Sequence, residues 1–569
     1  MLGSEVVSPE ASPSLPSSME NSQPAKRARV LRAEGSGDGA ALLLSASQRV
    51  ASAKDIVSGS LLPTLASENL EGFKAVLPTA RPYPELITWA SCCSGSEGVH
   101  YVVEAAMLAL EDAGFLVNFK HLFSCESNKT KREWILHVLK TGLVFDPVCS
   151  DTLASDSSYG CVFTDICEMG QEEATCARHD AKCPVVPVDC LFVGTSCKDL
   201  SRANSSVDRT KLVLNQDTSK GASAQTFRGM LEYCAGHRPV LLIYENVDAI
   251  DDKISAQTET NLSLLMQAMR DLSYEGKKVM TDAQEFGLPC RRRRLYILFV
   301  DVTSDKLDFT EEAIGRVFAT FSDLITSCMR THPLVQQTIF QPENSEHKEL
   351  VAEILTQQQA IATKSAEKAK NSEQKQPQTW MDKHIAYADG LGVRWASPVA
   401  EKLASNPWFQ ALTMRERDAL VLSRVAAPEC EFRNLSQSLG RINSSVSSTS
   451  SGSLIAPTML PGQILWIESQ ERLLTGFEAL VLQGYPIVPL MQKAPLPPGL
   501  RSQSFLNDLA GNAMALPVAL AMFQCALAAV PWATDRESCS SSDAEDEEVA
   551  TALAAVAVLN SGGRPQADV

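Results

Sequence analysis

The sequence lacks a secretory signal and lacks an apolar run of transmembrane length, so we expect neither a secreted nor a membrane protein. Its 16 cysteines are scattered, and no CxxC pair occurs together with a second such pair. We therefore predict free thiols in an intracellular, reducing compartment. The net charge of -17 argues against a protein that coats nucleic acid non-specifically, although a local basic cleft stays compatible with it.

Four cysteines recur every seven residues, at Cys176, Cys183, Cys190 and Cys197. The segment changes from loop to strand along the way, and zinc sites usually carry closely spaced ligand pairs. We attribute this spacing to chance and predict no metal site.

Both ends of the sequence lack sustained apolar periodicity. Residues 1–80 are rich in Ser, Ala, Pro and Gly, which predicts a mostly disordered tail. Its basic cluster, Lys26 to Arg29, fits a nuclear import signal and a solvated charge run about equally, so we expect a nuclear or otherwise a cytoplasmic protein. Residues 533–569 begin with an acidic, serine-rich stretch that suits phosphorylation and is not expected to contact DNA.

The clearest chemical signal lies between Val188 and Ser201, in the sequence VDCLFVGTSCKDLS. Its apolar run stops at Gly194, which predicts a buried strand that ends in a tight loop carrying Cys197. Reactive groups in open α/β sheets lie beyond the carboxyl ends of the strands. Lys198 would favour the nucleophilic thiolate of Cys197, and an unreactive structural cysteine is the alternative.

A glycine turn follows the first predicted strand, residues 86–90. The turn contains Gly95 and leads into a predicted helix, residues 99–113. Strand, glycine turn and helix are typical of the first part of a nucleotide-type α/β fold, because glycine lets the backbone approach a ligand.

Acidic residues follow the next predicted strands. The strand over residues 119–125 ends in Glu126, at a position suited to binding ribose hydroxyls. A shorter run, residues 161–163, is followed by Asp165. We expect both acids at the same edge of the sheet as Cys197.

Two further predicted strands carry polar groups of opposite charge. The run over residues 239–244 ends in Glu245, and four arginines, Arg291 to Arg294, precede a strand over residues 295–300. Arginines next to a buried strand are costly to pack unless they face an anion or a polar ligand, and a solvated turn is the alternative. A single shared site explains the polar groups at these strand ends better than independent coincidences do.

In this order the motifs resemble those of the DNA (cytosine-5)-methyltransferase family. Residues 472–486 are similar to the family's ninth motif and residues 511–514 to its tenth, so the resemblance runs from residue 86 to about 523. It implies a Rossmann-like class I methyltransferase fold: a mixed, mostly parallel α/β sheet with helices on both faces, and a smaller, irregular target-recognition region.

The resemblance also implies a division of the chain. The expected parts are a tail (1–80), the first catalytic part (81–305), the target-recognition region with flexible linkers (306–465), the late motifs (466–532) and an acidic tail (533–569). Within the third part we predict a helix over residues 311–330, a helix or linker over residues 350–376, and a flexible serine-rich loop over residues 444–453. No zinc finger, homeodomain or repeat pattern is present there, so the preferred target sequence cannot be deduced.

The implied activity is methyl transfer from S-adenosylmethionine to C5 of cytosine in DNA through a covalent cysteine. C5 is a poor nucleophile, so Cys197 would add to C6, and Glu245 would be the acid that protonates or hydrogen-bonds N3. Arg292 and Arg294 match the family's arginine box, with Arg294 the more probable contact to O2. Transfer RNA is the alternative substrate, and a non-catalytic relative that binds nucleic acid or cofactor is the second alternative.

The resemblance places the cofactor against the early and late motifs. Glu126 would bind the ribose hydroxyls and Asp165 the adenine amino group. The residues expected around the cofactor are Ser94, Gly95, Glu126, Asp165, Ile166, Asn512 and Ala513.

The sequence departs from the family pattern beside these groups, at Cys93, Glu97, Ser196, Lys198 and Cys290. Ser196 and Lys198 replace a proline and a glutamine around the nucleophile, which predicts a less rigid loop. Glu97 would repel the cofactor's carboxylate unless Lys198 compensates it. The alternative is that Glu97 points to solvent.

Overall fold

The described part of the chain comprises most of residues 53–533. The computed structural model describes residues 53–73, 83–115, 117–145, 159–204, 211–215, 221–253, 259–308, 313–331, 345–372, 379–395, 399–442 and 455–533. All of them belong to one compact unit, Leu44–Val569. The basic cluster, the acidic tail and the serine-rich loop of the sequence predictions lie outside the described residues.

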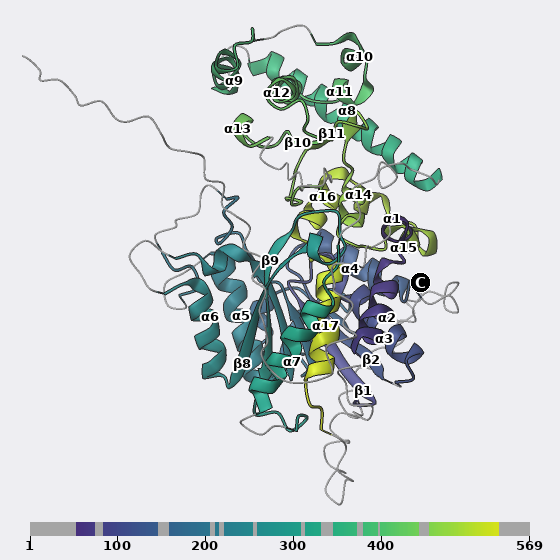
Figure 1. Ribbon diagram of the computed structural model, residues 1–569, viewed down its shortest axis with the longest axis vertical. Helices are drawn as coiled ribbons and strands as arrows, with labels where there is room; N and C mark the ends of the chain where they lie inside the picture. The colour runs from purple at the N-terminus through teal and green to yellow at the C-terminus, as the bar shows by residue number, and fades with distance from the viewer. Residues whose placement is uncertain are drawn as a thin grey trace, which may run out of the picture. The chain divides into compact units, whose positions relative to one another are not determined.

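Nine strands of the described chain form one mixed sheet (Figure 1). They are β1 Leu86–Cys92, β2 Asn118–Cys125, β3 Cys161–Phe163, β4 Glu173–Cys176, β5 Ala181–Pro184, β6 Cys190–Val193, β7 Leu241–Val247, β8 Tyr274–Asp282 and β9 Arg293–Asp301. Their order across the sheet is β5-β4-β3-β2-β1-β6-β7-β9-β8. Strands β3, β2, β1, β6 and β7 are parallel, whereas β9 runs antiparallel to β7 and β8. The predicted fold class is therefore confirmed.

Helices cover both faces of this sheet (Figure 1). One face packs against α5 Ala222–His237 and α6 Asn261–Asp271, and the other against α3 Gly98–Asp112, α4 Lys129–Thr141, α7 Ala313–Ser327 and α17 Leu516–Ala529. Side chains alternate between the two cores along each strand. In β1, Ile87 and Trp89 face one core, whereas Ala90 and Cys92 face the other.

Residues 53–73 form two helices, α1 Ala53–Ser58 and α2 Leu61–Phe73, that pack into the core on the α3 and α17 side of the sheet. The prediction of disorder over residues 1–80 is therefore wrong for this segment. Leu62 and Phe73 are fully buried. The side-chain amide of Asn69 donates to Gln524 Oε1 at 3.0 Å, which fastens α2 to α17. An early segment of the chain thus completes the core built by the last helix.

Helix α17 is the most apolar of the helices that pack against the central sheet. Together with α16 Gln503–Asn512 it forms a stretch, Gln503–Ala529, that is long and apolar enough to cross a membrane, although the sequence prediction found no such run. Within the apolar 18-residue window of this stretch, 89% is buried inside the protein. Its apolar character therefore reflects packing against the sheet and its neighbouring helices.

The chain between α7 and the late motifs is mainly helical. Its elements are α8 Ser345–Ser372, α9 Thr379–Gly390, α10 Glu401–Ala404, α11 Pro407–Gln410, α12 Met414–Ala426, β10 Phe432–Asn434, α13 Leu439–Ile442, β11 Leu465–Ile467, β12 Arg472–Leu473, α14 Gly476–Val481 and α15 Ile487–Lys493. Strands β10, β11 and β12 form a small antiparallel sheet. The predicted helix over residues 311–330 is confirmed by α7 Ala313–Ser327. Of the two alternatives for residues 350–376, helix or linker, the described part to Ser372 is helical, in α8. The predicted domain boundaries stay predictions.

Candidate active site

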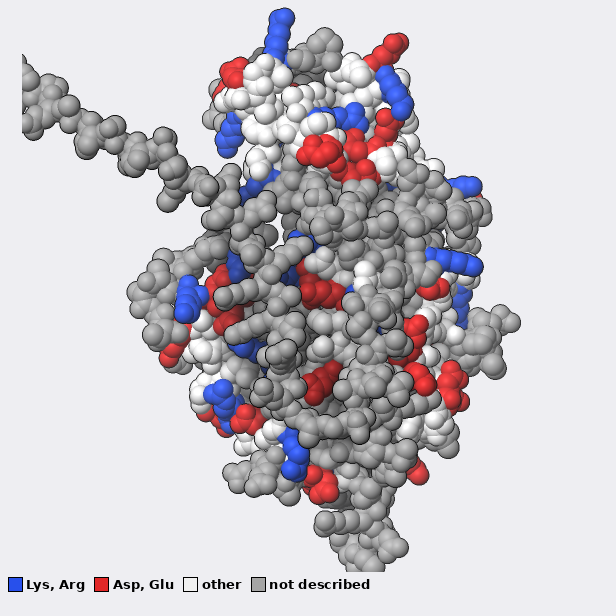
Figure 2. Space-filling view, in the orientation of Figure 1, with Lys and Arg blue, Asp and Glu red and all other residues white. Residues whose placement is uncertain are grey.

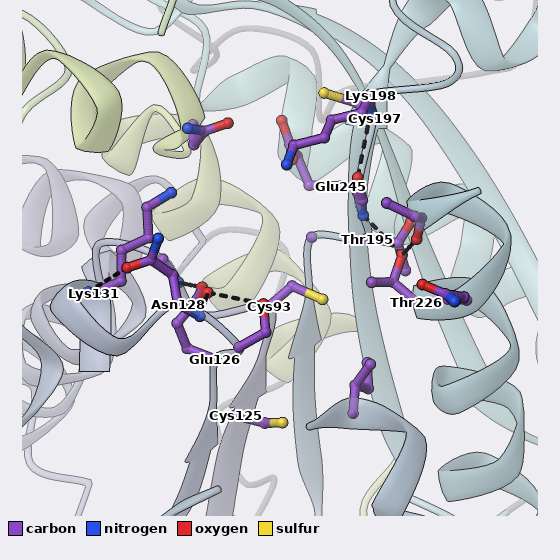
Figure 3. A pocket seen from close by; sticks show the side chains of 18 of the residues that line it. Cys93, Cys125, Glu126, Asn128, Lys131, Thr195, Cys197, Lys198, Thr226 and Glu245 are labelled. Atoms are coloured by element: carbon purple, nitrogen blue, oxygen red, sulfur yellow. Dashed lines mark hydrogen bonds between the residues drawn. The ribbon is translucent and has the colours of Figure 1, made fainter. Parts of the chain in front are cut away.

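The carboxyl ends of the parallel strands open into one pocket with a volume of about 870 Å³. Cys197 and Glu245 lie at one end of it, and Glu126, Asn128 and Lys131 at the other (Figure 3). Strand β9 runs the opposite way, so its beginning brings Arg294 to the same edge. The expectation that separate strand ends share one site is therefore met by the geometry.

Hydroxyl groups of α5 hold the loop that carries Cys197. The Ser196 N–H donates to Thr226 Oγ1 at 3.0 Å, and the Asp199 N–H donates to Ser223 Oγ at 3.1 Å. The carbonyl of Cys197 accepts from the N–H groups of two following residues. These bonds fix the loop that was expected to be less rigid without a proline.

The Cys197 thiol lies among charged groups but is mostly shielded from water. Burial raises its pKa, and the Glu245 carboxylate raises it further, while Arg294 and Arg292 act in the opposite direction. Lys198 is not named among the groups that shift this pKa most, so the predicted stabilisation of the thiolate by Lys198 stays a prediction. The raised pKa favours the neutral thiol, whereas the two arginines favour the thiolate.

An ion pair joins Glu245 and Arg294 next to this thiol. Arg294 Nε lies 3.1 Å from Glu245 Oε1, and both side chains are largely buried. No hydrogen bond from the described residues reaches Glu245 Oε1, because the alignment of the pair is poor. Oε1 is buried and faces the Arg294 cation, so the ion pair holds the Glu245 carboxylate at the pocket wall.

Arg292 lies deeper than Arg294. Its guanidinium contacts the carbonyl of Gly511 at 3.3 and 3.4 Å, and its Nε is buried without a partner among the described residues. Burial lowers its pKa to about 10, and the Arg294 charge adds to this effect. Arg292 links the beginning of β9 to the late motif and lines the pocket together with Arg294.

A buried network that the sequence analysis missed fixes the end of β7. The Asn246 amide donates to the carbonyl oxygen of Thr195 at 3.1 Å and to Tyr244 Oη at 3.0 Å. Thr195 Oγ1 and Tyr244 Oη lie 2.7 Å apart. Asn246 directly follows Glu245 at the end of an apolar run, so its sequence position was a usable signal. Nothing in the sequence indicated its partners.

The Glu126 carboxylate is held by backbone groups at the other end of the pocket. Its two oxygens accept from the N–H of Gly95 at 3.0 Å and from the N–H of Asn128 at 2.8 Å. Gly95 has a left-handed backbone with φ 53°, which glycine adopts without strain. The glycine turn therefore orients the acid that the sequence assigns to a ribose.

The other predicted cofactor residues divide into lining and supporting positions. Asp165, Ile166 and Asn512 line the same pocket as Cys197. Ser94 faces a smaller adjacent cavity, and its hydroxyl bonds to the Ser91 hydroxyl and to the carbonyl of Cys125 at the end of β2. Ala513 is buried and lines neither cavity. The structure thus brings most, but not all, of the predicted residues to the pocket.

Glu97 does not point to solvent and does not contact Lys198. It is fully buried at the beginning of α3, where Ser91 Oγ donates to its carboxylate at 3.0 Å. Burial raises its pKa to about 7. Both interpretations of Glu97 offered by the sequence are therefore wrong, because the carboxyl group lies beneath the glycine turn.

Two further contacts near the pocket were not foreseen. Cys290 is buried, and its thiol donates to the carbonyl of Leu482 at 3.1 Å, so this departure from the family's arginine box lies outside the pocket lining. Lys131 pairs with Asp508 at 2.8 Å and joins α4 to α16 across the pocket rim. Both contacts connect segments that are far apart in the sequence.

The mixed sheet and the pocket at its carboxyl edge are those of a Rossmann-like class I methyltransferase. The chain belongs to the C-5 cytosine-specific DNA methylase family, whose model matches residues 152–524. The family resemblance seen in the motifs is thereby confirmed. The matched range contains Cys197, Glu245 and Arg294, whereas Gly95 and Glu126 precede it.

Two curated relatives are both described as DNA (cytosine-5-)-methyltransferase DMT5. The protein of Cryptococcus neoformans var. grubii is 26% identical over 442 residues, which cover 75% of this chain and 16% of the relative. The protein of Verticillium dahliae is 24% identical over 507 residues, which cover 78% of this chain and 19% of the relative. The chain thus spans less than a fifth of the length of either relative.

The solved structures that match this chain include S. pombe Dnmt2 methyltransferase and a Spodoptera frugiperda DNMT2 variant. The first has 12% sequence identity and a TM-score of 0.34, covering 78% of this chain and 98% of that one. The second has 11% identity and a TM-score of 0.33, covering 77% and 99%.

Proposed function

We propose that this protein transfers a methyl group from S-adenosylmethionine to C5 of cytosine in DNA. The observation that carries the proposal is the meeting of Cys197, Glu245 and Arg294 in one pocket with Glu126 and Asp165. Family membership over residues 152–524 supports the same reaction.

In the proposed reaction, the sulfur of Cys197 bonds to C6 of the cytosine as its thiol proton is lost. The C5–C6 double bond then places electron density on C5, which takes up the methyl group. Loss of the C5 proton afterwards restores the double bond and expels the sulfur. Because burial raises the pKa of Cys197, the thiol must be deprotonated when the base arrives.

Glu245 and Arg294 would stabilise the base during this addition. Glu245, which lines the pocket together with Cys197, would act as the acid at N3. Arg294 Nε lies 3.1 Å from Glu245 Oε1, and its positive charge would stabilise charge at O2. The target base has to leave the duplex to reach these groups.

The pocket also fits a nucleoside-containing cofactor. Its volume of about 870 Å³ lies within the range of small-molecule sites, roughly 300–1,000 Å³. Glu126 is oriented by two backbone N–H groups, and Asp165 and Ile166 line the wall beside it. When bound, S-adenosylmethionine would supply the methyl group. Glu126 would hold the ribose, and Asp165 the adenine amine.

The charge of the pocket lining does not by itself indicate a nucleic-acid substrate. Five basic residues line the pocket, Lys198, Arg292, Arg294, Lys131 and Arg132, and so do five acidic ones, Glu126, Asp165, Glu168, Glu245 and Asp508. The described Lys and Arg side chains on the face shown in Figure 2 are likewise interspersed with Asp and Glu. We therefore propose DNA as the substrate on the ground of family membership over residues 152–524.

The direct test incubates the full chain with methyl-labelled S-adenosylmethionine and DNA, transfer RNA or no nucleic acid. We expect label in DNA at C5 of cytosine, and no incorporation by the Cys197→Ala variant. Cys190→Ala is the matched control, because Cys190 is a buried thiol of the same strand segment outside the pocket. Label in transfer RNA alone would show that transfer RNA, and not DNA, is the substrate. No label in either nucleic acid would favour a non-catalytic binding protein.

We also propose a nuclear location, supported by the basic cluster at Lys26 to Arg29 in the sequence. A fluorescent fusion in which these basic residues are replaced by alanine should move to the cytoplasm. Retention in the nucleus would remove the cluster from that role.

A further inference from the structure

Three cysteines and a histidine converge outside the pocket, at the edge of the central sheet. Cys161 begins β3, Cys176 ends β4, His179 lies in the turn that follows, and Cys183 lies in β5. One side-chain atom from each, three sulfurs and a ring nitrogen, lie within 4.8 Å of one another. None of the four residues lines the pocket that contains Cys197.

The distances within this cluster match those around a tetrahedral metal ion. His179 Nδ1 lies 3.7 Å from Cys161 Sγ, 3.5 Å from Cys176 Sγ and 3.2 Å from Cys183 Sγ. A tetrahedral zinc ion with Zn–S of about 2.3 Å and Zn–N of about 2.05 Å would separate sulfur and nitrogen by about 3.6 Å. All three sulfurs thus lie near the separation that shared coordination requires.

Hydrogen bonding alone does not explain this convergence. Nδ1 of a neutral histidine offers one lone pair, so it accepts from one thiol and leaves the other two without that partner. The opposite nitrogen of His179, Nε2, is buried and has no hydrogen-bond partner among the described residues. The contacts to the three sulfurs are therefore the ones that orient the ring, and a cation at their centre would satisfy all four groups.

We propose that Cys161, Cys176, His179 and Cys183 bind one structural zinc ion. Three thiolates and one imidazole are ligands that zinc prefers, and four protein ligands leave no open position for catalysis. The sequence analysis predicted no metal site, because it found no closely spaced ligand pairs and a segment that changes from loop to strand. The cluster uses Cys176 and Cys183 of the seven-residue series, and its other two ligands, Cys161 and His179, lie outside that series.

The zinc ion would stabilise a part of the fold that has little core of its own. Strands β4 and β5 have four residues each and lie at the outer edge of the sheet. The Thr164 N–H donates to the carbonyl of Thr175 at 3.0 Å, and the Thr175 N–H donates to Glu168 Oε2 at 2.7 Å. These bonds connect the hairpin to the segment that carries Asp165, so the metal would also support one wall of the pocket.

The test measures the metal itself, so it does not depend on the proposed methyl transfer. The full chain, expressed with added zinc and purified without chelator, should contain one zinc ion per chain by elemental mass spectrometry. X-ray absorption should give about three sulfur neighbours at about 2.3 Å and one nitrogen at about 2.05 Å. Cys183→Ser and His179→Ala should lower the zinc content at least several-fold, whereas Cys190→Ala should keep it.

Cobalt substitution of the wild type covers the case in which a variant fails to fold. Removing the zinc and adding Co²⁺ should produce the visible absorption of a tetrahedral cobalt ion and a sulfur-to-cobalt charge-transfer band. Folded wild-type protein without zinc, zinc content unchanged in both cluster variants, or a disulfide within the cluster by thiol counting would each overturn the proposal.

Discussion

Replacing Glu97 by glutamine should stabilise the protein in a pH-dependent way. Glu97 is fully buried, and burial raises its pKa from 4.5 to about 7. The folded state therefore binds this proton more tightly than the unfolded state. The free energy of unfolding should fall as the pH rises from about 4.5 to about 7 and stay level above that.

The size of this effect follows from the same pKa difference. Compared with a carboxyl group of unshifted pKa, Glu97 lowers the free energy of unfolding by about 3 kcal/mol at about pH 8 and by about 1 kcal/mol at about pH 5. Glutamine keeps the size of the side chain and carries no charge, so Glu97→Gln should remove most of this cost. Urea unfolding followed by tryptophan fluorescence at both pH values measures the difference between variant and wild type.

Comparison with a matched variant isolates the buried carboxyl group. Glu111→Gln lies on the same helix, α3, and is exposed to solvent. It should change the free energy of unfolding little at either pH, within about 0.5 kcal/mol. A Glu97→Gln effect that is equal at both pH values, or destabilising at the higher one, would refute the titration of Glu97 near neutral pH.

Three further variants test other parts of the structure. Asp165→Ala should weaken binding of S-adenosylmethionine by about 1 to 3 kcal/mol, the cost of a lost buried hydrogen bond, and unchanged affinity by calorimetry would remove Asp165 from the site. Thr226→Val removes the hydroxyl that holds Ser196 at 3.0 Å, so kcat should fall while cofactor affinity, measured by calorimetry, stays unchanged; equal losses in both would indicate general unfolding instead. Leu62→Ala should destabilise the protein by about 2–5 kcal/mol in urea unfolding, because Leu62 is fully buried, and a neutral effect would contradict the packing of α2.

The strands that position the site were predictable because they are buried on both faces. Such strands appear in the sequence as continuous apolar runs, and β6 (Cys190–Val193) and β7 (Leu241–Val247) are examples. Strand β8, Tyr274–Asp282, was missed because it is an edge strand and most of its residues are only partly buried or exposed. Helix α2 was missed because its burial depends on α17, which begins 443 residues after the end of α2.

The candidate site divides in the same way. Cys197 and Glu245 each come after an apolar run in the sequence, so their meeting at the carboxyl edge of the sheet could be predicted from the sequence. The burial of Glu97 could not, because a glutamate before a helix is usually exposed. The cluster around His179 was also hidden, because Cys161 is fifteen positions from Cys176 and meets it only when β3 pairs with β4.

The most direct test of the proposed reaction is to trap the bond between enzyme and base. DNA carrying 5-fluorocytosine at target positions cannot lose a proton from C5 after methyl transfer, so the sulfur cannot be expelled. With S-adenosylmethionine present, wild-type protein should form a covalent complex with this DNA, and peptide mass spectrometry should place the attachment at Cys197. Methylation of ordinary DNA together with no trapped complex, or attachment at a different residue, would contradict the account.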